Sequence, residues 1–174
     1  MIKIERVAHV VIKVRNMERS LDFYTRVLGL KVMGSIDPMV KFLSTGRDHH
    51  ELGIAEVGAE APDSTFFQVG MEHFAFKLSS EDDLREAYDT LLSEDVKIAY
   101  TINHGVAKSV YFYDPDGNQL EVYVDNTPEE VASFQNPYGG MDKLPFALDK
   151  PSLMDNIIQA QAEMAAAAEA GGKS

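Results

Sequence analysis

The amino-acid sequence predicts an α+β protein made of two paired βαβββ modules and a C-terminal extension. Two observations lead to this prediction. Two stretches of strand-like alternation are each followed by an amphipathic helical pattern and then by three further short strand patterns. These stretches, residues 5–14 and 70–78, also share a histidine that is followed four residues later by a lysine. Such self-similarity is typical of a duplicated structural unit.

The domain boundaries follow from this repeat. Residues 1–126 are expected to form one domain, which suits a chain of 174 residues. Its two modules span residues 1–57 and 68–126, and residues 127–174 form the extension.

Composition narrows the function. The formal net charge of −12 disfavours contact with phosphate backbones, so nucleic acid is not an expected partner. The absence of cysteine excludes disulfides and thiolate metal ligands. The first sixteen residues carry charges throughout, so we expect neither a signal peptide nor a membrane span. We therefore expect a cytoplasmic protein that acts on small molecules.

In the first module the strand pattern of residues 5–14 is followed by a helix expected over Ser20–Leu28, which Gly29 ends. In the second module the helix is expected over Ser80–Leu92, and Ser80 with Asp83 resembles a capping box. The remaining strand patterns cover residues 30–35, 39–44 and 49–57 in the first module, and residues 96–102, 107–113 and 118–124 in the second.

The C-terminal extension contains an alanine-rich segment, residues 153–170, that predicts a helix, with its end fraying over residues 171–174. This helix either covers the open sheet or joins a partner subunit in a homo-oligomer. The alternative is a helix that only packs on the domain. The segment Asn136–Met141 is expected to shape the pocket.

Strand parity places three polar residues on the faces opposite the apolar stripes: His9, His73 and Glu121. The apolar residues of those stripes are Val10, Ile12 and Val14; Phe74, Phe76 and Leu78; and Leu120, Val122 and Val124. Two modules whose bare sheet faces meet would form a cup-shaped mixed sheet. The three polar residues are then expected inside the cup.

Two histidines and one carboxylate form the facial arrangement typical of non-haem Fe(II) sites, although Mn(II), Ni(II) and Zn(II) accept the same ligands. A single strand histidine is more often a hydrogen-bonded structural residue. Here, however, His9 and His73 occupy equivalent places in the repeat, and Glu121 lies on an otherwise apolar strand. A carboxylate in that setting is costly without a compensating cation. The sequence therefore predicts one divalent metal inside the cup, held by His9, His73 and Glu121. We expect Fe(II), with Mn(II) as the substitute.

A second motif runs from His104 through Tyr111 and an Asp-Pro-Asp-Gly turn at residues 114–117 to Glu121. Its spacing closely resembles the signature of type I extradiol ring-cleavage dioxygenases, which belong to the vicinal oxygen chelate (glyoxalase/bleomycin resistance/dioxygenase) superfamily. The resemblance covers roughly residues 5–125. Because the second copy of the domain found in larger members is absent, the chain resembles the one-domain type.

This resemblance implies cleavage of a catechol-type ring by both atoms of O2 at Fe(II), an activity of aromatic hydrocarbon catabolism. His50 would be the acid–base residue, Tyr111 would hydrogen-bond a substrate oxygen, and His104 would assist at the pocket rim. Parity, however, places His50 with the helix-facing residues and His49 inside, unless a bulge near His49 reverses this. We prefer His50.

Two alternatives use the same scaffold. Glyoxalase-type lyases and acyl-CoA epimerases resemble the chain in their repeat, and add a fourth metal ligand at the repeat-equivalent of Glu121. That ligand would be Glu51 here. A metal-free small-molecule-binding resistance protein is the third possibility. Plausible aromatic pocket walls are Phe66, Phe67 and Tyr123.

Overall fold

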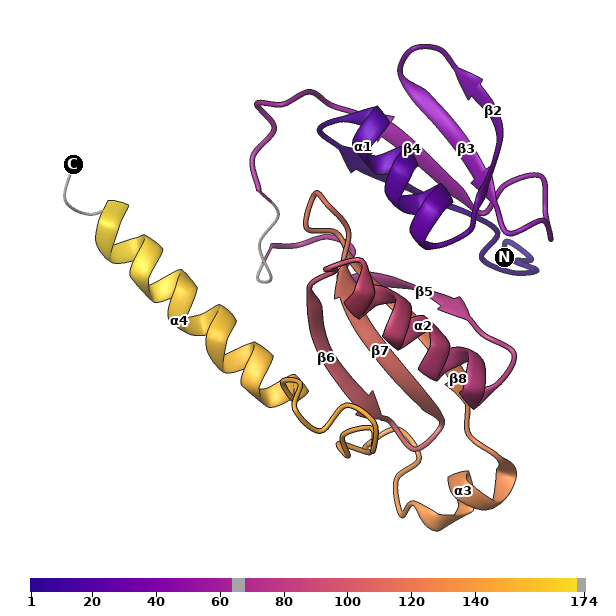
Figure 1. Ribbon diagram of the computed structural model, residues 1–174, viewed down its shortest axis with the longest axis vertical. Helices are drawn as coiled ribbons and strands as arrows, with labels where there is room; N and C mark the ends of the chain where they lie inside the picture. Colours follow the sequence, from indigo (N-terminus) through magenta and orange to yellow (C-terminus); the bar gives the residue numbers. More distant parts are fainter. Residues whose placement is uncertain (64–67, 172–174) are drawn as a thin grey trace. The chain divides into compact units, whose positions relative to one another are not determined.

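A computed structural model describes residues 1–63 and 68–171 (Figure 1). The chain divides into two compact units. The first comprises residues 1–63 together with the turn Asp114–Asn118, and the second comprises residues 68–113 and 119–171. Each unit contains a four-stranded mixed sheet, and the element order confirms the predicted α+β class and the duplicated βαβββ pattern.

The first unit begins with β1 and a helix that starts earlier than expected. Its elements are β1 (Val10–Val14), α1 (Met17–Asp22), a π-helical turn η1 (Phe23–Val27), β2 (Lys31–Ile36), β3 (Val40–Ser44) and β4 (Leu52–Glu56), with the strands in the order β1-β4-β3-β2. The side chain of Asn16, rather than Ser20, caps α1 by accepting a hydrogen bond from the backbone N of Arg19 at 2.8 Å. Gly29 follows the helix with a φ of 71°, as expected of a helix-ending glycine.

The second unit repeats this order. Its elements are β5 (His73–Lys77), α2 (Glu81–Ser93), β6 (Ile98–Asn103), β7 (Ala107–Tyr113) and β8 (Gln119–Asp125), with the strands in the order β5-β8-β7-β6. Ser80 caps α2 by accepting from the backbone N of Asp83 at 3.1 Å, which confirms the predicted start.

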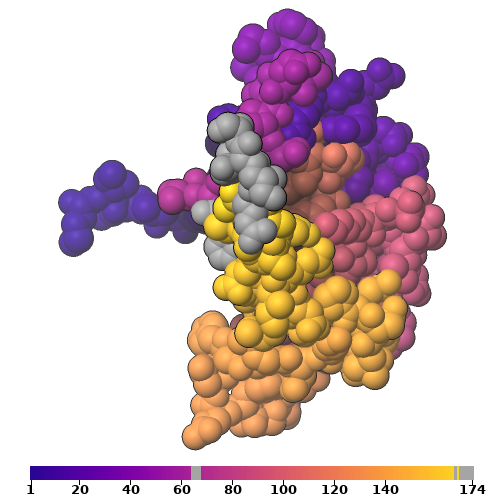
Figure 2. Space-filling model, turned by 90° about the vertical axis from the view of Figure 1, so that its left-hand side faces the viewer, coloured from indigo at the N-terminus to yellow at the C-terminus, as the bar shows by residue number. Residues whose placement is uncertain are grey.

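Within the described residues, two helices follow β8. The short α3 (Pro128–Ser133) was not expected from the sequence, although Thr127 and Glu130 form a complete capping box at its start. The predicted C-terminal helix is confirmed as α4 (Leu153–Gly171). Figure 2 shows α4 in yellow beside the orange residues that precede it. None of the helices in the described part of the chain combines the length and apolar character needed to cross a membrane.

One face of each sheet is buried with its helix, and this core contains part of the apolar stripes predicted from the sequence. In the first unit Ile12, Leu52 and Ile54 are buried together with Tyr24 of η1. The corresponding residues of the second unit are Val110, Phe112 and Leu120 of the sheet and Leu84, Tyr88 and Leu91 of α2. This leaves the polar residues predicted from parity on the opposite face of each sheet.

The strand register is equivalent in the two sheets. In each sheet the first and last strands are parallel, and the outer antiparallel pair carries an irregularity at the same place, between Val32 and Gly34 or between Ile98 and Tyr100. One row across the first sheet is Val11, Gly53, Phe42 and Gly34, and the equivalent row across the second is Ala75, Glu121, Tyr111 and Tyr100. The register therefore pairs each residue of this row in one module with a residue in the other.

Candidate active site

The second sheet brings together His73 and Glu121, two of the three predicted metal ligands. They lie on the neighbouring parallel strands β5 and β8, where His73 is opposite Gln119, two residues before Glu121. The Nε2 atom of His73 is 3.1 Å from Oε2 of Glu121. Glu121 is only 8% exposed, so its carboxylate needs a cation or strong hydrogen bonds to remain charged.

The other ring nitrogen of His73 is held by Glu72. His73 donates from Nδ1 to the Glu72 carboxylate, which also accepts from Nε2 of Gln119 at 2.8 Å. Metal-binding histidines are commonly oriented in this way, with one nitrogen on a carboxylate and the other free to coordinate. This arrangement directs Nε2 of His73 towards Glu121, so the two side chains fit a shared metal ion.

The pKa values of His73 and Glu121 are both shifted by their contact. Hydrogen bonding to Glu121, and then to Glu72, raises the pKa of His73 to about 9. Burial acts to raise the pKa of Glu121, but hydrogen bonding to His73 and the imidazolium charge outweigh it, so this pKa lies below its ordinary value. The pair is therefore an imidazolium and a carboxylate at neutral pH, and a bound cation would replace the proton.

Tyr111 lies directly opposite Glu121 in the β7–β8 register. Its ring stacks on Tyr100, with centroids 4.3 Å apart, and meets the ring of His73 edge-on at 5.0 Å. Burial raises the pKa of Tyr111 far above its ordinary value, so the hydroxyl remains a proton donor at neutral pH.

His104 follows β6 and lies 3.1 Å from Tyr111, measured from Nε2 to the hydroxyl oxygen. Burial lowers the pKa of His104, which favours the neutral imidazole. The tautomer of the neutral ring then decides whether Nε2 donates to the Tyr111 oxygen or accepts from its hydroxyl. The structure thus joins the two residues that the sequence motif placed seven positions apart.

The three other histidines gather in the first unit. His9 immediately precedes β1, and its ring centroid is 4.6 Å from that of His50, which is 4.8 Å from Phe42. His49 and His50 share a contact of 2.5 Å between their Nδ1 atoms. Burial, with His49 and His9 nearby, lowers the pKa of His50.

The position of His50 needs no bulge. Strand β4 begins only at Leu52, so the alternation that assigned His50 to the helix face does not extend to it. The ring of His50 contacts Phe42, whose neighbour Leu43 is the fully buried, helix-facing residue of β3. The parity argument therefore does not apply to His50, whose ring lies beside those of His9 and Phe42.

Glu51 does not occupy the place expected for a fourth ligand. The register pairs Val11 with Gly53 and Ala75 with Glu121, so the repeat-equivalent of Glu121 is Gly53. The Glu51 carboxylate instead accepts from the backbone N of Thr45 at 3.1 Å and from its hydroxyl at 2.7 Å. A carboxylate ligand from the first module is therefore not available at that position.

The predicted turn at residues 114–117 is formed, and Gly117 supplies the positive φ of 84°. Within the first unit, Tyr24 donates its hydroxyl to Asp114 at 2.9 Å. Asp116 pairs with Arg19 at 2.6 Å and with Arg15 at 3.4 Å. These contacts are structural and bring no ligand to the site.

The predicted residues are thus divided between the units. His73, Glu121, Tyr111 and His104 meet in the second unit, whereas His9 and His50 belong to the first. Within residues 1–63 and 68–171, no three histidine, aspartate or glutamate side chains form a group that could hold a metal ion.

Of the expected pocket walls, Tyr123 shares the face of Glu121, while Phe66 and Phe67 lie outside the described residues. The sequence reading missed Glu72 and Tyr100. Glu72 could have been found because it is adjacent to His73 in the sequence. Tyr100 could have been found from strand parity.

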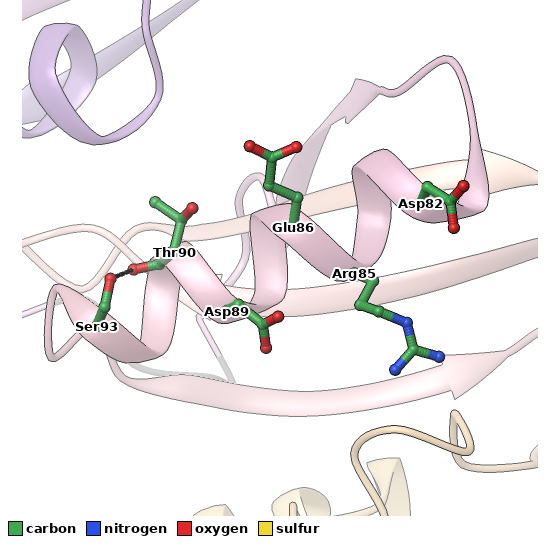
Figure 3. Close-up of a pocket in the computed structure, with 6 residues that line it drawn as sticks. All are labelled: Asp82, Arg85, Glu86, Asp89, Thr90 and Ser93. Carbon is green, nitrogen blue, oxygen red and sulfur yellow. Dashed lines mark hydrogen bonds between the residues drawn. The ribbon is translucent and has the colours of Figure 1, made fainter.

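A separate open pocket of about 480 Å³ lies along α2 (Figure 3). Its lining residues are Asp82, Arg85, Glu86, Asp89, Thr90 and Ser93, all from one helix. The Arg85 guanidinium lies 4.7 Å from the centre of the Phe146 ring, and three of the other five residues are acidic. This pocket contains none of the histidines and is not the predicted site.

The duplicated βαβββ fold and the paired histidine and glutamate define the class of protein. The chain belongs to the Glyoxalase/Bleomycin resistance protein/Dioxygenase superfamily, whose family model matches residues 6–122. The resemblance seen in the sequence is confirmed at this level.

Individual relatives differ in activity. The chain is 33% identical over 134 residues to biphenyl-2,3-diol 1,2-dioxygenase 3 of Rhodococcus globerulus, covering 75% of this chain and 70% of the relative. It is 26% identical over 140 residues to a lactoylglutathione lyase of Neisseria meningitidis, covering 75% of this chain and 98% of the relative. A solved glyoxalase/dioxygenase structure from Nostoc punctiforme shares the fold with a TM-score of 0.59 and 23% identity, over 71% of this chain and 92% of that one.

Proposed function

We propose that the protein is an extradiol dioxygenase that cleaves the ring of a catechol-type substrate with O2 at a non-haem Fe(II). The observation that carries the proposal is the hydrogen bond between Tyr111 and His104. Tyr111 also lies opposite Glu121 in the sheet, and its ring contacts that of His73. Metal binding alone would need His73 and Glu121, but a tyrosine and a second histidine beside them suit a polar aromatic substrate.

The proposed ligands are His9, His73 and Glu121. The arrangement of Glu72, His73 and Glu121 supports two of them, and the equivalence of His9 to His73 in the repeat supports the third. Two imidazoles and a carboxylate are a donor set that Fe(II) accepts, and Mn(II) is the possible substitute. When bound, the metal supplies the electron transfer between catechol and O2.

The remaining residues would handle protons and orientation. The Tyr111 hydroxyl, kept protonated by burial, would donate to an oxygen of the bound substrate. His104, with its proton on Nε2, would donate to the oxygen of that hydroxyl and fix its direction, which leaves the hydroxyl proton for the substrate. His50, whose lowered pKa favours the neutral form, would take up and return a proton during turnover.

The lyase or epimerase alternative is less well supported by the site. Four-ligand members of the superfamily need a carboxylate at the position that Gly53 occupies here, and Glu51 is bonded to Thr45. A metal-free resistance protein would not need the His73–Glu121 pair. Similarity to a biphenyl-2,3-diol dioxygenase favours a bulky catechol as substrate.

The test is aerobic incubation of the iron-loaded protein with catechol, 2,3-dihydroxybiphenyl and protocatechuate. We expect oxygen uptake together with a coloured ring-cleavage product, most rapidly with 2,3-dihydroxybiphenyl. A Glu121→Ala protein treated in the same way is the control for adventitious iron. Iron-loaded protein that leaves all three substrates colourless, with no oxygen consumed, would refute the proposal.

A further inference from the structure

The segment 136–142, which we call the strap, crosses the turn that carries His104. The backbone N of Asn103 donates to the carbonyl of Asp142 at 2.6 Å, and these two residues form an isolated antiparallel bridge. The backbone N of Gly140 donates to the carbonyl of His104 at 3.1 Å. The strap thus bonds to the backbone on both sides of the histidine's Cα.

Gly140 allows this close approach because it has no side chain. A Cβ added to Gly140 would lie 2.4 Å from the carbonyl oxygen of Asn103 and 2.7 Å from the carbonyl carbon of His104. Both are backbone atoms, so neither can turn aside as a flexible side chain would. Gly140 is buried, and any larger residue there must displace the strap or the histidine turn.

The other side of the turn is fixed by Asn126, which is only 7% exposed. Its Nδ2 donates to Oδ1 of Asn103 at 2.8 Å and to the carbonyl of Gly105 at 3.1 Å. Oδ1 of Asn103 also accepts from the backbone N of Gly105 at 2.9 Å. The backbone of residues 103–105 is therefore held between Asn126 and the strap.

From this arrangement we infer that the strap positions His104 against Tyr111, and that Gly140 is a positioning residue of the site. His104 reaches Tyr111 with a single hydrogen bond of 3.1 Å, and a small shift of the turn is enough to break it. The catalytic meaning of this positioning rests on the proposed function, but the positioning itself does not.

The direct test compares Gly140→Ala with Gly139→Ala in the full-length chain. Gly139 is the matched control, since a Cβ there would meet the Nδ2 of Asn136, an exposed side chain that can move. The readout is the ¹⁵N signal of His104 Nε2 in protein loaded with diamagnetic Zn²⁺. Tyr111→Phe provides the reference for a His104 that has lost its hydrogen bond.

We expect Gly140→Ala to move the His104 signal most of the way to its position in Tyr111→Phe, and Gly139→Ala to leave it unchanged. A wild-type His104 signal in folded Gly140→Ala would overturn the inference. If Gly140→Ala does not fold, the wild-type chain still decides, through nuclear Overhauser contacts between the Gly140 Hα protons and the amides of His104 and Gly105. Absence of those contacts would also overturn it.

A double-mutant cycle separates positioning from a general structural role. We expect Gly140→Ala to lower kcat on 2,3-dihydroxybiphenyl about tenfold with a smaller change in KM. In a His104→Ala background the same substitution should have almost no further effect, because its action passes through His104. A second loss of about tenfold would contradict this. If wild-type protein cleaves no catechol, the proposed function fails while the His104 signal still tests the strap.

Discussion

The two modules share one frame but differ in what they place on it. The first sheet has the row Val11, Gly53, Phe42 and Gly34 where the second has Ala75, Glu121, Tyr111 and Tyr100. Glycine stands in place of the carboxylate, and phenylalanine in place of the tyrosine. The comparison teaches that the two sheets share one register, but that only the second module places reactive side chains in this row.

The two modules also differ in which of the two parallel strands carries the larger side chain of this row. In the first module the large residue, Val11, is on the parallel outer strand and its partner Gly53 is small, whereas the second module has the small Ala75 beside the large Glu121. A Cβ added to Gly53 would lie only 3.0 Å from Cγ2 of Val11. On the two parallel strands of each row, one residue is therefore large and its neighbour is small.

The largest expected effect is on metal retention. Loss of His73 or Glu121 by substitution with alanine should empty the site, since each removes a ligand, while wild-type protein purified without oxygen should hold about one Fe(II) per chain. Glu51→Gln should retain iron, because Gly53 and not Glu51 is equivalent to Glu121. Iron per chain measured by a colorimetric assay decides this. Loss of iron in Glu51→Gln would restore the four-ligand alternative.

The second effect is on turnover. Tyr111→Phe should keep iron and fold but lower kcat on the preferred catechol by about tenfold to a hundredfold, because one hydrogen bond to the reacting oxygen is lost. Tyr88→Phe, whose ring is buried on α2 against Phe146 and away from Glu121, serves as the matched variant and should remain near wild type. Equal rates for Tyr111→Phe and wild-type protein would make Tyr111 a packing residue.

A third prediction tests the exchange of volumes. Gly53→Glu should lower the free energy of unfolding by about 3 kcal/mol, because its side chain is forced against Val11. Val11→Ala combined with Gly53→Glu copies the second module and should recover much of that loss. Urea unfolding of the single and double variants measures the difference. If the double variant is no more stable than the single one, the sizes of the residues at positions 11 and 53 are not coupled.

The smallest expected effect compares Tyr24 with Tyr88, which lie fifteen residues beyond the histidines of their modules. Tyr24 donates to the buried Asp114 at 2.9 Å, whereas Tyr88 packs its ring edge-on against Phe146. Tyr24→Phe should cost about 1.5 kcal/mol of unfolding free energy at pH 7, and Tyr88→Phe less, since its ring contact remains.

The loss in Tyr24→Phe should depend on pH. Burial raises the pKa of Asp114 above its ordinary value, and the Tyr24 hydroxyl is one of the groups that limit this rise. A raised folded-state pKa means that stability falls as pH rises through it, so removing Tyr24 adds a loss above that pKa and little below it. Urea unfolding at pH 7 and at pH 3.5 should show the larger loss at pH 7, and the opposite order would contradict the assignment.

Much of the fold was predictable because it depends on local patterns. Alternation of apolar residues located the strands, and the Ser80 cap located α2. The start of α1 was misplaced because Asn16 competes with Ser20 as a cap. Register was beyond local patterns. Glu51 and Gly53 have the same parity, and only the pairing of β1 with β4 shows which one is equivalent to Glu121.

The site was predictable where the chain repeats itself and not where distant segments meet. The equivalence of His9 and His73 and the spacing from His104 to Glu121 were visible in the sequence. The strap was not predictable, because its hydrogen bonds join residues more than thirty positions apart. Its key residue, Gly140, matters because it has no side chain, so that the two backbone segments can approach each other. A backbone contact of this kind leaves no polar signature in a sequence.

The stack of Tyr100 on Tyr111 has an optical consequence. The sequence contains seven tyrosines and no tryptophan, so tyrosine dominates its near-ultraviolet absorption and emission. Two of those rings are held 4.3 Å apart at 20° in a buried, chiral setting beside His73. Their near-ultraviolet circular dichroism should be sensitive to whatever displaces or reorients the Tyr111 ring. The protein therefore carries its own chromophore at the site, and ligand binding can be followed without a label.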